Sequence, residues 1–248
     1  MIPKVIHYCW FGRNPLPPLA KKCIASWKKY LPDYEIKEWN EDNFDVNMLP
    51  YTKEAYEAKK YAFVSDFARF WILYNYGGIY FDTDVEVIKN MDHIISQGDF
   101  MGSELDITIG HNSIHVAPGL GLGAEAKRAF YKEIIDLYST LHFILQDGTQ
   151  NKKTVVQYTT ELLIKHGLTN NGKIQYIAET HIYPCDYFCP ISLLDFKLHK
   201  TENTICIHHY AGSWKEPKEL RIKKLRIFFR VVQIKNLLRK LNLYHKIL

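Results

Sequence analysis

The sequence GGIYFDTD, at residues 77–84, contains an apolar segment that leads directly into two carboxylates. Residues 79–81 predict a short buried strand, and the glycines before them are typical of the C-terminal end of a helix. Side chains alternate along a strand, so Asp82 and Asp84 would point to the same side if the chain stayed extended. A divalent cation would relieve their repulsion, and oxygen ligands suit Mg²⁺ or Mn²⁺. An isolated Asp-x-Asp is common in surface turns, so the flanking sequence has to distinguish a cation site from two surface aspartates.

The segment before this strand carries a second group of polar residues. Residues 54–76 have the apolar spacing of one long helix that ends at the glycine pair. Within it, Ser65, Asp66 and Arg69 have apolar residues on both sides, which predicts that they are buried. Asp66 and Arg69 are three residues apart and share a helix face. Buried charges need partners, which the hydroxyl and phosphate groups of a ligand would supply. The alternative is an exposed ion pair, which contributes little to stability.

The rest of the pattern predicts an α/β domain, because short apolar strands alternate with helices. Further strands are expected at residues 5–10, 34–39, 85–88 and 204–210, and further helices at residues 19–30, 127–143 and 155–166.

Length and charge fit one folded domain followed by a basic tail. The chain has 248 residues, of which 47% are hydrophobic, enough for a sizeable core. Residues 215–248 contain eleven Lys or Arg against two Glu, so the net charge of +5 belongs to this tail and the remainder carries −4. A globally cationic nucleic-acid-binding domain is therefore excluded, and no nucleic-acid partner is expected.

The five cysteines, at positions 9, 23, 185, 189 and 206, form no paired metal-binding motif. A reducing cytoplasm is the simpler interpretation of this odd, scattered set. No long apolar segment follows the first residues, so no signal peptide is expected. No apolar run reaches the roughly 18 residues that a membrane-spanning helix would need.

Four segments together resemble glycosyltransferase family 32, the transferases whose sugar-binding region contains the Asp-x-Asp motif. These segments are residues 2–10, 62–69, 74–84 and 208–214. The combination of Ser-Asp-x-x-Arg with Gly-Gly-Ile-Tyr-x-Asp-x-Asp is specific, and the catalytic domains of the clostridial glucosylating toxins are similar at a greater distance. The resemblance implies a GT-A fold, a Rossmann-like mixed sheet flanked by helices, over residues 1–215. It also implies a divalent metal and a transfer that retains the anomeric configuration.

The resemblance assigns donor-binding roles by motif. Trp10 would stack on the nucleobase, usually uracil, although a core tryptophan is an equally good interpretation of the residue alone. Asp66 and Arg69, with Ser65 beside them, would hold the hydroxyls and phosphate of the donor, because the planar fork of arginine suits phosphate oxygens. Tyr80 would contact the nucleotide.

The same resemblance assigns the metal ligands. Asp84 would bind the metal directly, whereas Asp82 would bind the ribose and reach the metal indirectly. His208 and His209 face opposite ways on a strand, so one of them can face the site. Similar His-Tyr-x-Gly segments in related retaining transferases favour His209 as a metal or phosphate ligand, and His208 remains the alternative.

Further contacts are predicted in less regular segments. Ser213 and Trp214 would close over the diphosphate, and Asn112 would face the donor or the acceptor. Residues 159–160, two threonines, match a family position near the donor only in part. The glycines of residues 119–123 do not follow the Rossmann order, and no nucleotide role is expected for them.

These assignments predict a metal-dependent hexosyltransferase that uses Mn²⁺ or Mg²⁺. The donor would be a UDP-hexose or UDP-N-acetylhexosamine, with GDP-mannose less favoured, and the acceptor a saccharide or lipid-linked saccharide of a bacterial capsule or lipopolysaccharide. Two other classes stay open. A metal-dependent phosphotransferase or nuclease would require further acidic ligands, and a catalytically inactive sugar-nucleotide-binding scaffold would not need the intact carboxylates.

The tail, residues 216–248, predicts a basic amphipathic helix. Such a helix is typical of one that lies on an anionic membrane surface, where each Lys or Arg contributes roughly 1 kcal/mol. A helix packed on the acidic body, or one that joins two subunits, is the alternative. We therefore expect a cytoplasmic enzyme, peripheral on the inner face of the cell membrane. The apolar stripe consists of Ile227, Val231, Ile234, Leu238 and Leu241.

Overall fold

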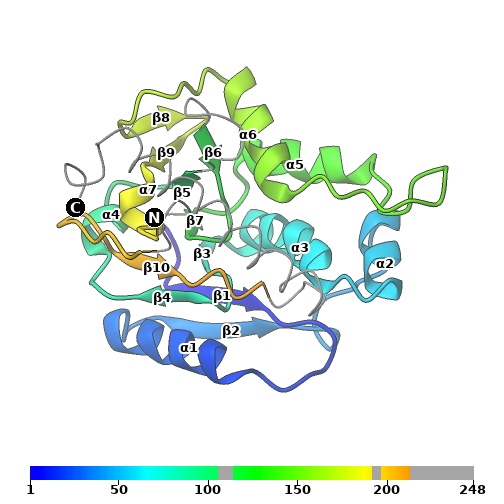
Figure 1. Cartoon of the computed structure of the whole chain (residues 1–248), viewed down its shortest axis with the longest axis horizontal. Coiled ribbons are helices and arrows are strands. Elements are labelled where there is room, and N and C mark those ends of the chain that lie inside the picture. The colour runs from blue at the N-terminus through cyan, green and yellow to red at the C-terminus, as the bar shows by residue number, and fades with distance from the viewer. Residues whose placement is uncertain (106–113, 192–196, 213–248) are drawn as a thin grey trace, which may run out of the picture.

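The computed structural model describes residues 1–105, 114–191 and 197–212 (Figure 1). Its main feature is an eight-stranded mixed sheet. The strands of this sheet are β1 (Val5–Cys9), β2 (Glu35–Trp39), β3 (Gly78–Tyr80), β5 (Phe100–Leu105), β6 (Ile114–Val116), β7 (Leu122–Ala124), β8 (Gln175–Ile177) and β9 (Thr180–Tyr183). A separate pair consists of β4 (Val85–Val87) and β10 (Cys206–His208), which run antiparallel.

The strand order of the main sheet is β2-β1-β3-β7-β5-β9-β8, and β6 pairs with β5 outside this path. The strands β1, β2 and β3 are parallel, and β5 is parallel to β9. The strand β7 runs antiparallel to both of its neighbours, β3 and β5. A mixed sheet with helices on both faces confirms the predicted α/β fold class.

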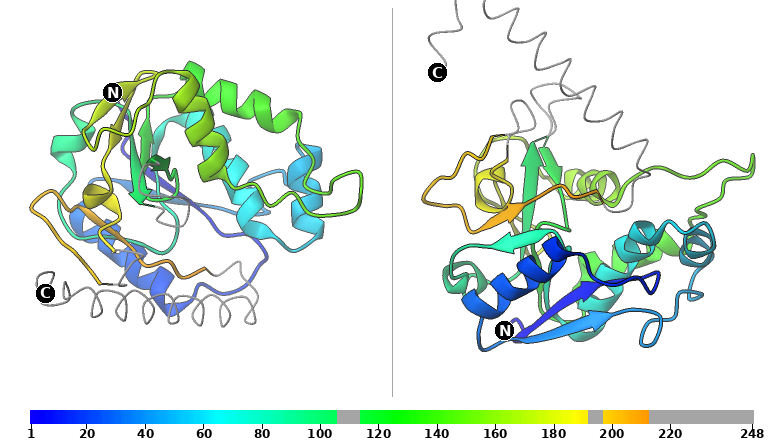
Figure 2. Two further views of the ribbon diagram at one scale, coloured as in Figure 1. Left: turned by 45° about the horizontal axis from the view of Figure 1, so that its top comes forward. Right: turned by 60° about the horizontal axis from the view of Figure 1, so that its bottom comes forward.

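Helices cover both faces of the sheet and bury a hydrophobic cluster on each. They are α1 (Pro18–Tyr30), α2 (Pro50–Glu57), α3 (Tyr61–Tyr76), α4 (Asp92–Ile95), α5 (Ala129–Ser139), α6 (Val155–Lys165) and α7 (Cys185–Phe188). Figure 1 shows α2, α3, α5 and α6 grouped together, and these helices share the cluster around Phe67 and Tyr131. On the other face α1 packs against β4, next to β10, as the right view of Figure 2 shows.

Two sequence features explain how the helices are placed. Trp27 is fully buried on the inner side of α1, and its indole N–H donates to the Val85 carbonyl at 2.8 Å. Thr154 caps the N-terminus of α6 by accepting from the Gln157 N–H, while the Gln157 side chain returns to the Thr154 backbone. These contacts fix α1 to β4 and fix the first turn of α6.

The predicted single helix over residues 54–76 is wrong, because the chain forms α2 and α3 with a break between them. Lys59 adopts a left-handed conformation with φ 57°, which no continuous helix allows. The apolar pattern continues on both sides of this break, so periodicity alone did not reveal it. The predicted end of the helix is confirmed, because Gly77 follows α3 with φ 64°.

The Asp-x-Asp segment forms a turn and not a continued strand. The strand β3 ends at Tyr80, β4 begins at Val85, and the Val85 N–H donates to the Asp82 carbonyl at 3.0 Å. The condition for Asp82 and Asp84 to share one side is therefore not met. Among the described residues, no helix is both long and apolar enough to cross a membrane.

Candidate active site

Asp82 is held in place by buried residues of α3 and β3. Arg69 is only 3% exposed, and its Nη2 lies 2.8 Å from Asp66 Oδ1 and 3.3 Å from Asp82 Oδ1. The Tyr80 hydroxyl donates to the same Asp82 oxygen at 3.1 Å, and the guanidinium lies 5.0 Å from the centre of the Tyr80 ring. The Asp82 side chain stays 33% exposed, so this carboxylate is fixed from within and open on its outer side.

Burial and mutual attraction set the protonation of this group. Burial raises the pKa of Asp66 to about 7, although Arg69 and the Val155 N–H at the start of α6 act in the opposite direction. Burial lowers the pKa of Arg69, but the carboxylates of Asp82 and Asp66 together with Tyr80 outweigh it and hold that pKa above its ordinary value. Arg69 is therefore a fixed positive charge at the base of Asp82.

Asp84 has different partners, which come from the end of the described chain. Its Oδ2 accepts from the Ala211 N–H at 2.8 Å and lies 3.4 Å from His208 Nε2. Burial raises the pKa of Asp84, but His208 and the Ala211 N–H outweigh it, so the pKa lies below its ordinary value. Conversely, burial lowers the pKa of His208, and the neighbouring Asp84 carboxylate raises it well above its ordinary value.

The two histidines occupy the reverse of the favoured arrangement. His209 turns away from Asp84, and its Nε2 is hydrogen-bonded to Glu86 Oε2 at 2.8 Å. The His209 backbone N–H still donates to the Asp84 carbonyl at 3.0 Å. Adjacent residues of an extended chain face opposite sides, so the register of β10, which pairs His208 with Val85, decides which ring reaches Asp84. The open alternative, His208, is the one that lies beside the carboxylate.

The remaining predicted donor residues differ in accessibility. Trp10 follows β1 and is partly exposed, with its indole N–H donating to the Asn14 carbonyl at 2.6 Å. Ser65 donates to the Tyr61 carbonyl, and its own carbonyl accepts from Arg69 Nε at 3.1 Å. Tyr80 is 1% exposed with its hydroxyl directed at Asp82, so in this structure it supports the carboxylate from within the core.

Gly119 belongs to the site and was missed by the sequence analysis. Its carbonyl accepts from the Asp82 N–H at 2.9 Å. A Cβ at this position would lie 1.9 Å from Asp82 Oδ2, a distance that real Cβ atoms essentially never show, and 3.0 Å from Arg69 Nη1. The glycine spacing was tested only against a nucleotide-binding loop, whereas the reason for glycine here is the close approach of Asp82.

The remaining predicted residues either lie outside the described part of the chain or are threonines buried in α6. Asn112, Ser213 and Trp214 lie outside the described residues, as does the predicted tail, residues 216–248. Thr160 accepts from the Val116 N–H at 2.9 Å through its hydroxyl, and Thr159 is fully buried.

Comparison with known proteins finds a family model that matches the region containing the Asp-x-Asp motif. The family model described as "Glycosyltransferase sugar-binding region containing DXD motif" matches residues 17–101, which include α3 and the Asp-x-Asp turn. The resemblance to this glycosyltransferase family is confirmed.

Two curated glycosyltransferases illustrate the range of relatives. An uncharacterized glycosyltransferase of Acanthamoeba polyphaga mimivirus is 28% identical over 211 residues, which cover 79% of this chain and 80% of that protein. Inositol phosphoceramide mannosyltransferase 1 of Schizosaccharomyces pombe is 30% identical over 111 residues, or 40% of this chain and 33% of the yeast protein. The chain thus spans about a third of the yeast transferase and most of the viral one.

Comparison with solved structures also finds glycosyltransferases. PaToxG glycosyltransferase gives a TM-score of 0.49 at 18% identity, over 66% of this chain and 69% of that chain. A glycosyltransferase involved in the glycosylation of the major capsid of PBCV-1 also gives 0.49, at 12% identity over 91% of this chain and 99% of that chain.

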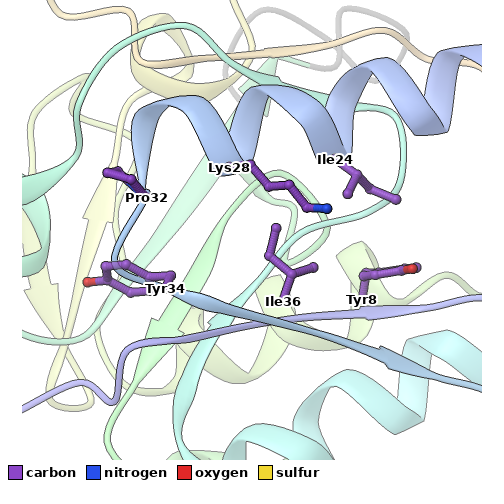
Figure 3. A pocket seen from close by; sticks show the side chains of 6 residues that line it. All are labelled: Tyr8, Ile24, Lys28, Pro32, Tyr34 and Ile36. Carbon is purple, nitrogen blue, oxygen red and sulfur yellow. The ribbon is translucent and has the colours of Figure 1, made fainter.

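A separate surface pocket lies between α1 and the strands β1 and β2 (Figure 3). Its volume is about 490 Å³, and Ile24 and Lys28 reach into it from α1. Tyr8 lines it from β1, with the Tyr8 hydroxyl donating to Glu38 Oε2 at 2.5 Å. None of its lining residues is among the predicted site residues. The complete lining is Tyr8, Ile24, Lys28, Pro32, Tyr34 and Ile36.

Proposed function

We propose that the protein transfers a hexose or N-acetylhexosamine from a UDP-sugar to a saccharide acceptor, with retention of the anomeric configuration and with a divalent cation at Asp84. The observation that carries this proposal is that the two carboxylates of the motif have different partners. Asp82 is fixed by Arg69 and Tyr80, whereas Asp84 accepts one backbone N–H and lies beside His208. In this proposal the anchored Asp82 contacts the ribose of a nucleoside-diphosphate donor, and Asp84 binds the cation that accompanies its diphosphate.

The residues around Asp84 fit a hard or borderline divalent cation. Asp84 Oδ2 and His208 Nε2 lie 3.4 Å apart, which allows both atoms to bind one ion after a small movement. Carboxylate oxygen with one imidazole nitrogen suits Mn²⁺, and Mg²⁺ less well. The bound cation would neutralise the charge that develops on the departing diphosphate.

The two buried charges of α3 act on Asp82 in this proposal. Arg69 lies between the Asp66 and Asp82 carboxylates, so its charge is already neutralised within the protein. We therefore assign it to holding Asp82 in one orientation, in place of the predicted direct contact with phosphate. The 33% exposed outer side of Asp82 is then available to accept a hydrogen bond from a ribose hydroxyl of the donor.

For the reaction itself we propose a front-side displacement. The bond between the anomeric carbon and the phosphate oxygen breaks, a bond to the acceptor hydroxyl oxygen forms on the same face, and the hydroxyl proton passes to the departing phosphate. Retention follows without a covalent enzyme intermediate. A trapped glycosyl-enzyme would replace this proposal with a double displacement.

The donor and acceptor classes are proposed from two directions. The sequence resemblance favours UDP, while the yeast relatives named as inositol phosphoceramide mannosyltransferases add a mannosyl donor and a lipid acceptor as a second candidate. A lipid-linked saccharide acceptor for a bacterial surface polysaccharide, reached at the membrane through the basic tail, remains part of the proposal. A sedimentation assay with anionic liposomes, comparing the full chain with residues 1–217, tests the membrane component separately.

A donor screen tests the proposed function. The full-length protein is incubated with UDP-glucose, UDP-galactose, their N-acetylated forms and GDP-mannose, with Mn²⁺ or EDTA, and released nucleotide is measured. We expect slow hydrolysis of one UDP-sugar with Mn²⁺ and none with EDTA. Preference for GDP-mannose would favour the second candidate, a mannosyltransferase with a lipid acceptor. Tight binding of donor without hydrolysis would indicate an inactive scaffold.

A further inference from the structure

A cluster of sulfur, nitrogen and oxygen donors lies next to the Asp84 side of the site. Glu104 of β5, Cys189 after α7 and His208 of β10 each direct one ligand atom to a common point, and these atoms lie within 4.8 Å of one another. Tyr210 adds a fourth polar atom, with its hydroxyl 2.9 Å from Cys189 Sγ and 3.2 Å from Glu104 Oε2. Three separate segments of the chain therefore meet at one point.

The backbone fixes these groups before any ligand arrives. Cys189 is 4% exposed, and its N–H donates to the Cys185 carbonyl at 2.7 Å. Tyr210 has a left-handed backbone with φ 50°, an unfavourable conformation for an aromatic residue, and its ring centre lies 4.2 Å from that of His208. A strained residue at a cluster of ligands is the kind of feature that binding sites retain.

His208 has one ring nitrogen to spare for a ligand. Its Nε2 is the atom near Asp84, whereas its Nδ1 is buried and, within the described part of the chain, has no hydrogen-bond partner. A buried polar atom without a partner costs free energy, and a bound cation would remove that cost.

We propose that Glu104, Cys189 and His208 form a zinc site that shares His208 with the Asp84 centre. One thiolate, one imidazole and one carboxylate, with Tyr210 or water in fourth position, make a tetrahedral donor set typical of Zn²⁺. The thiolate favours Zn²⁺ over Mn²⁺ and Mg²⁺, which prefer oxygen. The two neighbouring sites thus differ in the cation they select.

The shared imidazole gives this site a consequence for the transferase, and this part rests on the proposed function. Zn²⁺ bound to Cys189 and to the Nδ1 of His208 would leave the imidazole proton on Nε2, so that Nε2 could donate to Asp84 but could no longer bind the Mn²⁺ ion. The thiol releases its proton on binding, so zinc binds more weakly as the pH falls. Micromolar zinc would therefore inhibit the Mn²⁺-dependent reaction.

Metal binding is measured directly on the full chain. Zn²⁺ affinity is determined by competition with a chromophoric chelator in excess Mn²⁺, and Co²⁺ is used as a spectroscopic substitute. We expect one ion per chain and a sulfur-to-cobalt charge-transfer band. Cys189→Ser should remove the band and weaken Zn²⁺ binding at least about tenfold. Cys185→Ser, four residues away on α7, is the matched control and should leave both unchanged.

Two further measurements keep the outcome unambiguous. Glu104→Gln keeps the size of the side chain and should also weaken binding, which guards against a folding defect specific to Cys189→Ser. Equal affinity in the wild type and both variants, or a cobalt complex without the band, overturns the zinc site. If the protein hydrolyses donor, zinc inhibition should be lost in Cys189→Ser. If it hydrolyses no donor, the proposed function fails, while the binding data still decide the zinc site.

Discussion

The two carboxylates of one motif lie in contrasting surroundings. Asp82 is anchored by residues from a continuous stretch, 65–82, in which the buried Asp66 and Arg69 and the partly exposed Asp82 are paired with each other. Asp84 is contacted by groups from distant segments, namely His208 and the backbone N–H of Ala211, and His208 in turn lies in a cluster with Glu104 and Cys189.

This contrast indicates a division between rigidity and reactivity. On the Asp82 side, the charges of Asp66, Arg69 and Asp82 are paired with one another, so this part of the structure holds the Asp82 carboxylate in position. On the Asp84 side, ligand atoms converge and the His208 Nδ1 is buried without a partner among the described residues. Disturbing the first side should therefore act on stability, and disturbing the second on metal binding and catalysis.

The largest effect is expected from Asp84→Asn. The amide keeps the volume of the carboxylate but removes the charge that binds the cation, so nucleotide release should fall roughly 10²- to 10³-fold. Initial rates in saturating Mn²⁺ measure this effect, and circular dichroism checks the fold. Asp92→Asn, at the exposed start of α4, is the control and should retain full activity. Near-normal turnover of Asp84→Asn would remove Asp84 from the catalytic centre.

Next in size is Arg69→Met on the anchored side. The change leaves two carboxylates, Asp66 and Asp82, without their shared cation, and breaking a buried ion pair costs about 3–5 kcal/mol of unfolding free energy. Urea denaturation measures the loss. Arg13→Met removes an exposed arginine, which is paired with Asp42, and should change stability very little. Equal losses in the two variants would show that the Asp82 side is not the rigid part of the site.

A pH series tests the support beneath the anchored side. His7 accepts from Trp39 Nε1 at 3.0 Å, and its Nε2 lies 3.0 Å from the Gly77 carbonyl at the start of the motif. Burial lowers the pKa of His7 from 6.5 to about 4.

Between these pH values the unfolded chain binds the proton and the folded chain does not, so stability should rise with pH by about 3 kcal/mol. This contribution to the free energy of unfolding should be fully present above pH 6.5, and it should be lost as the pH falls towards 4. Urea midpoints of the wild type and His7→Gln across this range provide the measurement. If stability depended on pH in His7→Gln as it does in the wild type, the pH dependence would have to come from groups other than His7.

The smallest of these effects is expected from Gly119→Ala. Its Cβ would collide with the Asp82 carboxylate, and overpacking of this kind costs about 1–3 kcal/mol. A double-mutant cycle with Asp82→Ala, followed by thermal and urea unfolding, separates the collision from other causes. Because Asp82→Ala removes the clashing atoms, it should make Gly119→Ala nearly neutral. Additive losses would mean that Gly119 and Asp82 act independently.

The anchored side could be predicted from the sequence because it is local. Ser65, Asp66 and Arg69 all lie in α3, shortly before the Asp-x-Asp segment. Their apolar neighbours correctly indicated that Asp66 and Arg69 are buried, whereas Ser65 is only partly buried. Gly119 was not found, because only the three-dimensional distance to Asp82 requires glycine there.

The Asp84 side could be predicted only in part, because it depends on the order of strands and on register. The meeting of Glu104 with Cys189 follows from β5 and α7 packing together, which no local pattern encodes. The choice between His208 and His209 depends on a one-residue register in β10. The turn between β3 and β4, which separates the two carboxylates, was hidden by an apolar pattern that suggests a continuous strand.

Mn²⁺ binding to the full chain tests the central claim, that Asp84 holds the catalytic cation while Asp82 is anchored by the protein. Electron paramagnetic resonance records the loss of the free Mn²⁺ signal during titration, with and without UDP, for the wild type, Asp84→Asn and Asp92→Asn. The account predicts one Mn²⁺ ion per chain, bound more tightly with UDP, and at least about tenfold weaker binding in Asp84→Asn alone. Equal Mn²⁺ affinity in all three proteins would contradict it.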